Sequence, residues 1–471
     1  MNLGGIAFQL WSPAPKSPWD AGLTILAARR LRGLSIYPDA VSDQASAMYG
    51  PVVPILTSWI FHVFGISNRA GKLLSLGASL SVVGLVLAAT ARRELRSCTI
   101  AVALLFACSH NTRFYFVEAR PDMVATLFAL IALCLFADWE QSRRVTGLIV
   151  SLACFVLAFL AKQPLAAAAL VPLCEVAFRG RAGSRRRATA FAIAALPLAA
   201  VLLAIVCLRE GSPRTFFYMI VLPAQYHLSP GKALRIACSV LLASAPLFLV
   251  VLGVAPRPLW ADARVRWWSA GVGVFFVAGV VTMAKEGGTW NSLLPFLIAS
   301  AGFSTLQLPR ALALLDSPTL STGLQVGVSV VFAATLAMFA FMHPADLRWD
   351  IVGVHGDRRY DYVVAVARAL PGRVRCPEDP TIPLLARGEI TRSAYFEMDF
   401  AHWPRRLPAV VEDDIEGARY VIQVRGGMPL VKEDRLRRLG FVPVDVEGLP
   451  QRGAYRLWTR TGDSSRFGPT G

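Results

Sequence analysis

The stretch FYFVEARPDM, residues 114–123, places a glutamate, an arginine and an aspartate within five positions of one another. Apolar runs flank it on both sides, residues 99–109 before it and residues 123–137 after it. Charged groups at the edge of a membrane are costly unless they are paired or used. The stretch therefore predicts a polar loop between two membrane spans, and its neighbours decide on which side of the membrane it lies.

The rest of the chain repeats this alternation of apolar runs and short polar loops. The chain has 471 residues, of which 55% are hydrophobic and 17% are charged. Apolar runs close to the length of a membrane helix recur along most of it. The ten clearest runs are residues 74–90, 99–109, 123–137, 147–161, 165–178, 189–208, 236–255, 268–284, 293–306 and 323–342. With a stub at the start, they predict a mainly α fold, a polytopic membrane helix bundle of about 10–11 spans.

The net charge of +17 does not indicate a nucleic-acid-binding protein. The arginines gather in every second loop between apolar runs, as cytoplasmic loops of membrane proteins do. They are not interleaved with aromatic residues along a surface. The arginine-rich loops contain Arg92, Arg93, Arg96, Arg143, Arg144, Arg179, Arg181, Arg185, Arg186, Arg187, Arg257, Arg264, Arg266 and Arg310. The alternate loops, FYFVEARPDM among them, are therefore predicted to face out of the cytoplasm.

The same parity predicts two domains. Residues 1–343 would form a transmembrane domain with a first outer loop at about residues 12–72, and residues 344–471 a small extracytoplasmic α/β domain with a disordered end. Within the outer loop, residues 51–66 are read as an interfacial or re-entrant helix, because a true span there would invert every later loop. We expect a multi-pass protein of the cell (inner) membrane.

The outward-facing polar residues are few and can be weighed individually. Asp20 starts a helical pattern with an apolar face suited to lying on the membrane surface, although its position is equally that of an N-cap. Glu118, Arg120 and Asp122 could form a local ion pair or a site. Lys162 and Lys285 each end a span on the outer side, where a lysine can snorkel or bind a lipid phosphate.

Metal and disulfide chemistry have no support in the sequence. Seven of the eight cysteines lie in or beside apolar runs, and Cys376 stands alone in the polar tail. No CxxC pair or Cys/His cluster occurs, so no metal site is predicted and the cofactor stays unknown.

Five motifs in the membrane region, over about residues 17–310, resemble the polytopic glycosyltransferases of the GT-C class. This class includes protein mannosyltransferases and aminoarabinose transferases of the family 39 type. The motifs are WDAGLTILAARRLRGLSIYPD (19–39), MYGPVVPILTSWIFHVFG (48–65), EARPDMVATLFAL (118–130), FLAKQP (159–164) and KEGGTWN (285–291). In the tail, CPEDPTIPLLARG (376–388) resembles a segment after the last span of some bacterial members.

The resemblance implies a role for each matching residue. Asp20 matches the first-loop acid, a general base or acceptor-orienting carboxylate, and Asp122, with Glu118 nearby, matches the second-loop acid. Arg120, Lys162 and Lys285 would contact the phosphate of the donor. Two further substrate-binding residues are implied by the Y-x-P-L and K-x-G-x-x-x-N motifs, Tyr49 and Asn291.

The implied reaction moves a sugar from a polyprenyl-phosphate donor to an extracytoplasmic acceptor, which is a lipid, glycan or protein, with inversion at the anomeric carbon. Many members carry a second acid near the first-loop aspartate, where this chain has Ala21 and Leu23, and this departure weakens a metal-dependent reading. The alternatives are a flippase or transporter of lipid-linked saccharide and a degenerate membrane scaffold. A transporter predicts charged residues deep within spans, whereas nearly all charges here lie at span ends.

Overall fold

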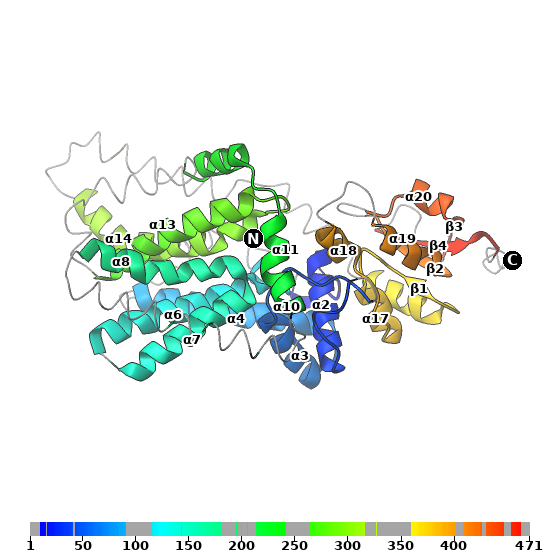
Figure 1. The fold of residues 1–471 in the computed structure, drawn as a ribbon, viewed down its shortest axis with the longest axis horizontal. Coiled ribbons are helices and arrows are strands. Elements are labelled where there is room, and N and C mark those ends of the chain that lie inside the picture. Colours follow the sequence, from blue (N-terminus) through cyan, green and yellow to red (C-terminus); the bar gives the residue numbers. More distant parts are fainter. Residues whose placement is uncertain are drawn as a thin grey trace.

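The computed structural model of the chain describes residues 10–15, 17–40, 43–90, 115–142, 144–179, 213–241, 263–315, 359–401, 408–425, 430–446 and 454–462, with residues 195, 199, 205 and 326. The described residues form a bundle of helices and a smaller unit built on a sheet, which lie at opposite ends of the molecule (Figure 1). We call the smaller unit, residues 359–462, the C-terminal unit. Helix α2 (Pro18–Leu31) stands between the two parts.

The bundle consists of long apolar helices. Their bounds are α4 (Asn68–Thr90), α6 (Pro121–Ser142), α7 (Val145–Ala161), α8 (Leu170–Arg179), α13 (Ala263–Ala284) and α14 (Leu294–Leu315). Among the described residues, three helical segments are long and apolar enough to cross a membrane, Asn68–Thr90, Pro121–Glu140 and Arg264–Ala284. These correspond to three of the ten predicted spans.

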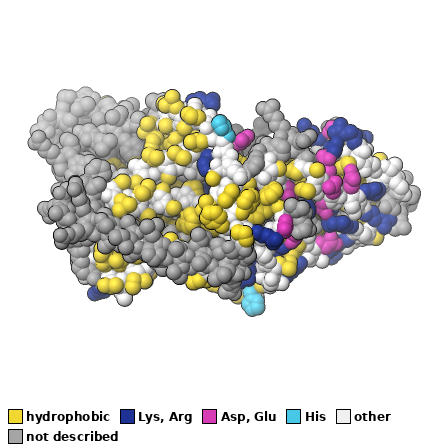
Figure 2. All heavy atoms as spheres, viewed as in Figure 1, with side chains coloured by type: hydrophobic (Ala, Val, Ile, Leu, Met, Phe, Trp, Pro, Cys, Tyr) yellow, Lys and Arg dark blue, Asp and Glu magenta, His cyan; other side chains and the backbone are white. Residues whose placement is uncertain are grey.

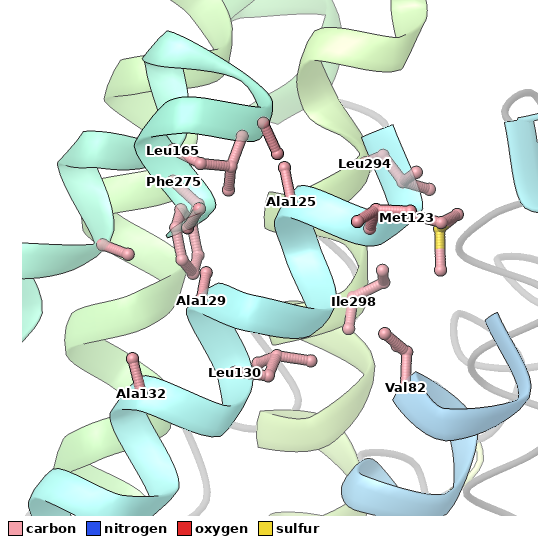
Figure 3. Packing of buried hydrophobic residues seen from close by; sticks show 14 of the residues in the cluster. Val82, Met123, Ala125, Ala129, Leu130, Ala132, Leu165, Phe275, Leu294 and Ile298 are labelled. Atoms are coloured by element: carbon pink, nitrogen blue, oxygen red, sulfur yellow. The ribbon is translucent and has the colours of Figure 1, made fainter. Parts of the chain in front are cut away.

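The core of the bundle lies where α6 meets its neighbours. Ala125, Ala129 and Ala132 are fully buried and recur at the spacing of one helix face. Small residues on one face let neighbouring helices approach closely, and Figure 3 shows Leu165 and Phe275 beside these alanines. The predicted membrane bundle is therefore packed through the small-residue face of α6.

Several other helical elements before the C-terminal unit are short. They are α3 (Val52–Phe64), η2 (Gln163–Ala169), α10 (Arg214–Phe216), η3 (Phe217–Val221), α11 (Leu222–Gln225) and η5 (Trp290–Leu293). The thirteen residues of α3 extend for about 20 Å, less than the roughly 30 Å of a bilayer core. Its side chains Trp59, Val63 and Phe64 are exposed. Both features fit the interfacial helix predicted at residues 51–66.

Helix α2 differs from its prediction in two ways. Its N-cap is Ser17, whose hydroxyl accepts a hydrogen bond of 3.2 Å from the backbone N–H of Asp20, so Asp20 lies in the first turn and is not the cap. Every residue from Asp20 to Arg29 is buried, because α3, α4, α17 and α18 pack around the helix. The expected membrane-surface helix is thus covered by protein, including a partner more than 350 positions away in the sequence.

The C-terminal unit has a four-stranded mixed sheet. Its strands are β1 (Val374–Arg375), β2 (Tyr420–Val424), β3 (Phe441–Val444) and β4 (Tyr455–Arg460), in the order β1-β2-β4-β3, and β1 is parallel to β2 while the other pairs are antiparallel. Its helices are residues 359–369, α17 (Thr381–Arg387), α18 (Ala394–Phe400), α19 (Ala409–Glu416) and α20 (Glu433–Arg438). Strands lie in RYVIQV (419–424) and GFVPVDV (440–446) and a helix lies in YDYVVAVARAL (360–370), so the unit contains both strands and helices, as an α/β unit does.

The bundle and the C-terminal unit differ in the side chains at their surfaces. Figure 2 shows lysine, arginine and acidic side chains gathered over the C-terminal unit, whereas hydrophobic side chains cover the described face of the bundle. Such a division fits a membrane-embedded bundle joined to a water-exposed unit. The whole predicted span at residues 99–109, most of the spans at residues 189–208, 236–255 and 323–342, and most of the predicted disordered end lie outside the described residues.

One glycine lets the C-terminal unit dock on α2. A Cβ atom added to Gly22 would lie 2.3 Å from Cζ of Phe396, a side chain of α18 that is itself buried. The ring of Phe396 also packs in a cluster with Leu23 and Leu26 of α2. The missing side chain at Gly22 therefore provides the space in which α18 rests against α2.

We predict that Gly22→Ala loosens the C-terminal unit, because the added methyl group overpacks this contact at a cost of about 1–3 kcal/mol. The measurement is the thermal midpoint of the full chain in detergent, together with the rate of proteolytic cleavage between the bundle and the C-terminal unit. Gly77→Ala in α4 is the matched control, because no atom lies within 4 Å of its added Cβ. Equal melting and cleavage of the two variants would contradict the assignment.

Candidate active site

A cavity of about 450 Å³ lies where the bundle, α2 and the C-terminal unit meet. Its wall includes five of the residues singled out in the sequence, namely Tyr49, Arg120, Lys162, Lys285 and Asn291. Three of these are cationic and come from three different segments of the chain. The wall also contains residues that the sequence did not single out, among them Trp19, Tyr226, Thr289 and Asp399.

Two of the cations are held by Asp122, in the first turn of α6. The ammonium group of Lys162 contacts Oδ1 of Asp122, and Nε of Arg120 lies 3.5 Å from Oδ2 of the same carboxylate. All three side chains are buried. Burial lowers the pKa of Lys162, and the Asp122 carboxylate opposes that shift. Asp122 thus does not pair with Arg120 alone but joins α6 to the residue that ends α7.

Arg120 is fixed on its other sides by aromatic rings and a hydroxyl. Its Nη2 donates a hydrogen bond of 3.2 Å to the hydroxyl of Tyr49. Its guanidinium carbon lies 5.2 Å from the ring centre of Tyr115 and 5.8 Å from that of Trp19. A planar cation prefers such stacked positions over aromatic faces. The guanidinium is therefore rigidly placed at the wall of the cavity.

The loop that carries Arg120 is anchored to α4. The hydroxyl of Ser79 donates to the carbonyl of Phe116 at 2.6 Å, and that of Ser75 donates to the carbonyl of Arg120 at 3.4 Å. The backbone carbonyls of a polar loop beside an apolar bundle must find donors. Serines on α4 supply them, so FYFVEARPDM is held against the bundle.

Glu118 lies behind this wall and is buried. Burial raises its pKa to about 7, with a smaller opposing effect from Arg120 and a further upward effect from Asp20. One oxygen of Glu118 lies 4.0 Å from Nη1 of Arg120. Asp20 and Glu118 are therefore close enough to repel each other when both are ionised. This pair of carboxyl groups forms an acidic layer under the cationic wall.

Two close backbone contacts set the position of Tyr49. A Cβ atom at Gly50 would lie 1.7 Å from the carbonyl oxygen of Leu160, so only glycine fits between this loop and the end of α7. The hydroxyl of Tyr37 donates to the carbonyl of Tyr49 at 2.6 Å. Burial raises the pKa of Tyr49 to about 12, although Arg120 opposes that shift. Tyr49 is thus a neutral hydroxyl group beside Arg120 and Lys162.

The third cation comes from the turn between α13 and η5. Nζ of Lys285 donates to the carbonyl of Pro223 at 3.0 Å, and the hydroxyl of Thr289 donates to Oδ1 of Asn291 at 2.5 Å. A Cβ atom at Gly288 would lie 2.5 Å from the carbonyl oxygen of Thr282. The turn therefore packs closely against the end of α13 at Gly288, and Lys285 and Asn291 line the same cavity.

The predicted residues divide into a wall and a supporting layer. Asp20, Glu118 and Asp122 are absent from the described lining of the cavity and lie buried behind it. No group of three or more His, Cys, Asp or Glu side chains is placed to hold a metal ion within the part of the chain that the structure describes. The cations and polar groups of the wall are suited to bind an anion.

Comparisons with known proteins identify the fold. No family model matches the sequence, and no curated protein matches it. The structure of ArnT from Cupriavidus metallidurans in the apo state matches with a TM-score of 0.65 and 13% identity, over 99% of this chain and 97% of ArnT. The structure of that ArnT bound to undecaprenyl phosphate matches with a TM-score of 0.64 and 13% identity, over 98% and 97% of the two chains.

The likeness extends over both the bundle and the C-terminal unit, because almost the whole of each chain is covered. ArnT is an aminoarabinose transferase of the GT-C class. The resemblance to this class, noted from five short motifs, is therefore confirmed at the level of the fold.

We predict that breaking the buried pair of Lys162 and Asp122 costs about 3–5 kcal/mol of stability, because either single change leaves an uncompensated buried charge. Lys162→Met and Asp122→Asn should each lower the thermal midpoint strongly, and the double variant should lose less than the two changes added together. The exposed pair of Arg438 and Asp434 is the control, where Asp434→Asn should cost less than about 1 kcal/mol. Strict additivity would show that the two residues do not interact.

We predict a pH effect at Glu118. Its pKa is about 7 in the folded chain and 4.5 in the ordinary case, so the fold favours the protonated form. The contribution of Glu118 to the free energy of unfolding is then fully present below about pH 4.5. It decreases as the pH rises toward 7, by up to about 3 kcal/mol. Relative to Glu118→Gln, the wild-type thermal midpoint should fall across this window and level off above it. Parallel profiles would contradict a raised pKa.

Proposed function

We propose that the chain is a membrane glycosyltransferase that takes a sugar from a polyprenyl-phosphate donor and passes it to an extracytoplasmic acceptor. The observation that carries the proposal is the convergence of Arg120, Lys162 and Lys285 on one cavity beside the ends of the bundle helices. Charged groups in such a place are costly unless they serve a function. A lipid phosphate entering from the bilayer would meet these cations first.

The fold supports the same class of donor. This chain shares its fold with ArnT of Cupriavidus metallidurans, and one structure of that ArnT has undecaprenyl phosphate bound. A polyprenyl chain is long and apolar, so its natural place is beside the apolar helices. Its phosphate then has to lie at the polar end of the bundle, where the cationic wall is.

The proposed reaction is a direct displacement at the anomeric carbon. The acceptor hydroxyl loses its proton to a carboxylate, its oxygen bonds to the anomeric carbon, and the bond from that carbon to the phosphate oxygen breaks. The electron pair leaves with the lipid phosphate, whose charge therefore grows in the transition state. Preorganised cations stabilise that growing charge without further reorganisation, which is the largest expected contribution to the rate.

The two predicted acids would take different parts in this scheme. Asp122 holds Lys162 and Arg120, so we propose that it positions the phosphate ligands and does not accept the proton. For Asp20, which is buried behind the cavity wall directly after Trp19, we propose the role of orienting the acceptor. Glu118, whose pKa burial raises to about 7, adds no negative charge beside Asp20 while it keeps its proton.

Lys285 offers the cleanest test, since its ammonium group donates to the carbonyl of Pro223 and forms no salt bridge with a carboxylate among the described residues. We predict that Lys285→Met weakens binding of undecaprenyl phosphate to the full chain in nanodiscs by about tenfold, the loss of one charge-assisted contact. The thermal midpoint should stay close to that of the wild type. Lys432→Met, an exposed lysine of the C-terminal unit, should leave the affinity unchanged.

The same nanodiscs separate the competing functions. Incubation with labelled polyprenyl-phosphate sugars and membrane acceptors should release lipid phosphate, and Asp20→Asn should abolish that release while it retains the lipid affinity. Labelled lipid that crosses the bilayer without turnover would favour a flippase. Wild-type protein that binds no lipid phosphate would overturn the proposed function.

A further inference from the structure

The C-terminal unit contributes a carboxylate to the cavity wall. Asp399 lies on α18, is 3% exposed, and lines the same cavity as Arg120 and Lys162. It comes from a part of the chain more than 230 positions beyond Lys162. A buried carboxylate is expensive unless hydrogen bonds or a bound partner compensate for its desolvation. Its place in a site otherwise built from the bundle therefore calls for an explanation.

Contacts from two other elements hold Asp399 in position. The indole Nε1–H of Trp19, on α2, donates to Oδ2 of Asp399 at 3.1 Å. The hydroxyl of Tyr226, which follows α11, donates to the backbone carbonyl of Asp399 at 2.6 Å. The ring of Trp19 also lies 5.2 Å from that of Tyr395, on α18. The carboxylate is thus oriented by aromatic residues that themselves line or adjoin the cavity.

Trp19 relates this carboxylate to the phosphate-binding cations. The guanidinium of Arg120 lies 5.8 Å from the centre of the indole ring, while the indole N–H bonds to Asp399. The indole of Trp19 therefore contacts both the positive and the negative side chain. Because Arg120 and Asp399 line the same cavity, a phosphate on Arg120 would bring the group bonded to it near Asp399. In a polyprenyl-phosphate sugar, that group is the sugar.

We infer that Asp399 binds a hydroxyl group of the sugar that is being transferred, an inference that rests on the proposed function. A carboxylate has about four acceptor positions, so it can accept hydrogen bonds from an indole N–H and from sugar hydroxyls at the same time. Trp19 and Tyr226 add ring surface with polar edges to the cavity wall beside Asp399, and such aromatic surface can pack against a sugar. The same carboxylate repels anionic sugars, so the site selects neutral ones.

The role differs from that of the cationic wall. Arg120, Lys162 and Lys285 would recognise the phosphate of any polyprenyl-phosphate lipid, with or without a sugar. Asp399 would recognise only the glycosylated form, and it would disfavour the bare lipid phosphate that remains after transfer, because that phosphomonoester carries more negative charge than the glycosylated phosphodiester. It is therefore a specificity-determining contact that discriminates between substrate and product at one site.

The test compares bare undecaprenyl phosphate with undecaprenyl phosphates that carry a neutral hexose or a neutral pentose. Dissociation constants are measured for the full chain in nanodiscs. The wild type should bind at least one glycosylated lipid about tenfold more tightly than the bare lipid. Asp399→Asn should remove most of that preference while it changes the affinity for the bare lipid less than about threefold, because the amide oxygen still accepts the bond from Trp19.

Two further variants keep the result interpretable. Asp413→Asn makes the same charge change at an exposed position of the C-terminal unit and should preserve the preference. Trp19→Phe removes the indole N–H that orients Asp399 and should give an intermediate loss. Melting curves show which variants fold.

The outcomes are distinct. A preference that survives Asp399→Asn, or a wild type with no preference for any glycosylated lipid over the bare one, overturns the role of Asp399. A loss of affinity for bare lipid as large as that for the glycosylated lipids would make Asp399 a structural residue and also overturn the inference. Failure of the wild type to bind even bare lipid is the failure of the proposed function instead.

Discussion

The contact between Lys162 and Asp122 is the constraint on which the rest of the site depends. A lysine and an aspartate lose several kcal/mol each when they leave water, and only a close, well-oriented pair recovers that cost. Here Asp122 lies in the first turn of α6 and Lys162 directly follows α7. The pair therefore fixes how far these two adjacent helices are shifted along each other. Arg120 contacts the same carboxylate, and its guanidinium is held by a hydrogen bond to the Tyr49 hydroxyl and by the indole ring of Trp19. Moving either helix by one turn would separate these charges in a poorly solvated place.

A second constraint is the burial of α2 between the bundle and the C-terminal unit. Gly22 admits the ring of Phe396, and Asn68 of α4 donates a hydrogen bond of 3.1 Å to the hydroxyl of Tyr360 in the C-terminal unit. The hydroxyl of Thr24, on α2, donates to the other end of the Asn68 side chain at 3.3 Å. One buried amide thereby ties α2, α4 and the C-terminal unit together. Because α2 also carries Trp19 and Asp20, the docking of the C-terminal unit sets the geometry of the site.

The sequence predicts those parts of this structure that have a local pattern of apolar or charged residues. Apolar runs marked α4, α6 and α13, and charge at span ends marked Arg120, Lys162 and Lys285, because desolvation cost restricts where charges can lie. The burial of α2 could not be read locally, since its covering helix α18 is more than 350 residues away. Asp399 was missed for the same reason. It stands in the segment AYFEMDF, which carries no motif, and contacts with Trp19 and Tyr226, both distant in sequence, hold it at the cavity.

The charge pattern of the cavity gives the C-terminal unit a part in the site beyond that of a cover. The bundle by itself would present three cations, which attract any phosphate and hold the product as firmly as the substrate. Asp399 bonds to the same indole that Arg120 contacts, and it changes the relative affinity for substrate and product. It adds an attraction for hydroxyl groups and a repulsion for a second negative charge. The carboxylate can have this effect only if its distance from the cations is fixed. The buried α2, with Trp19 at its start and Gly22 one turn later, provides that fixed distance.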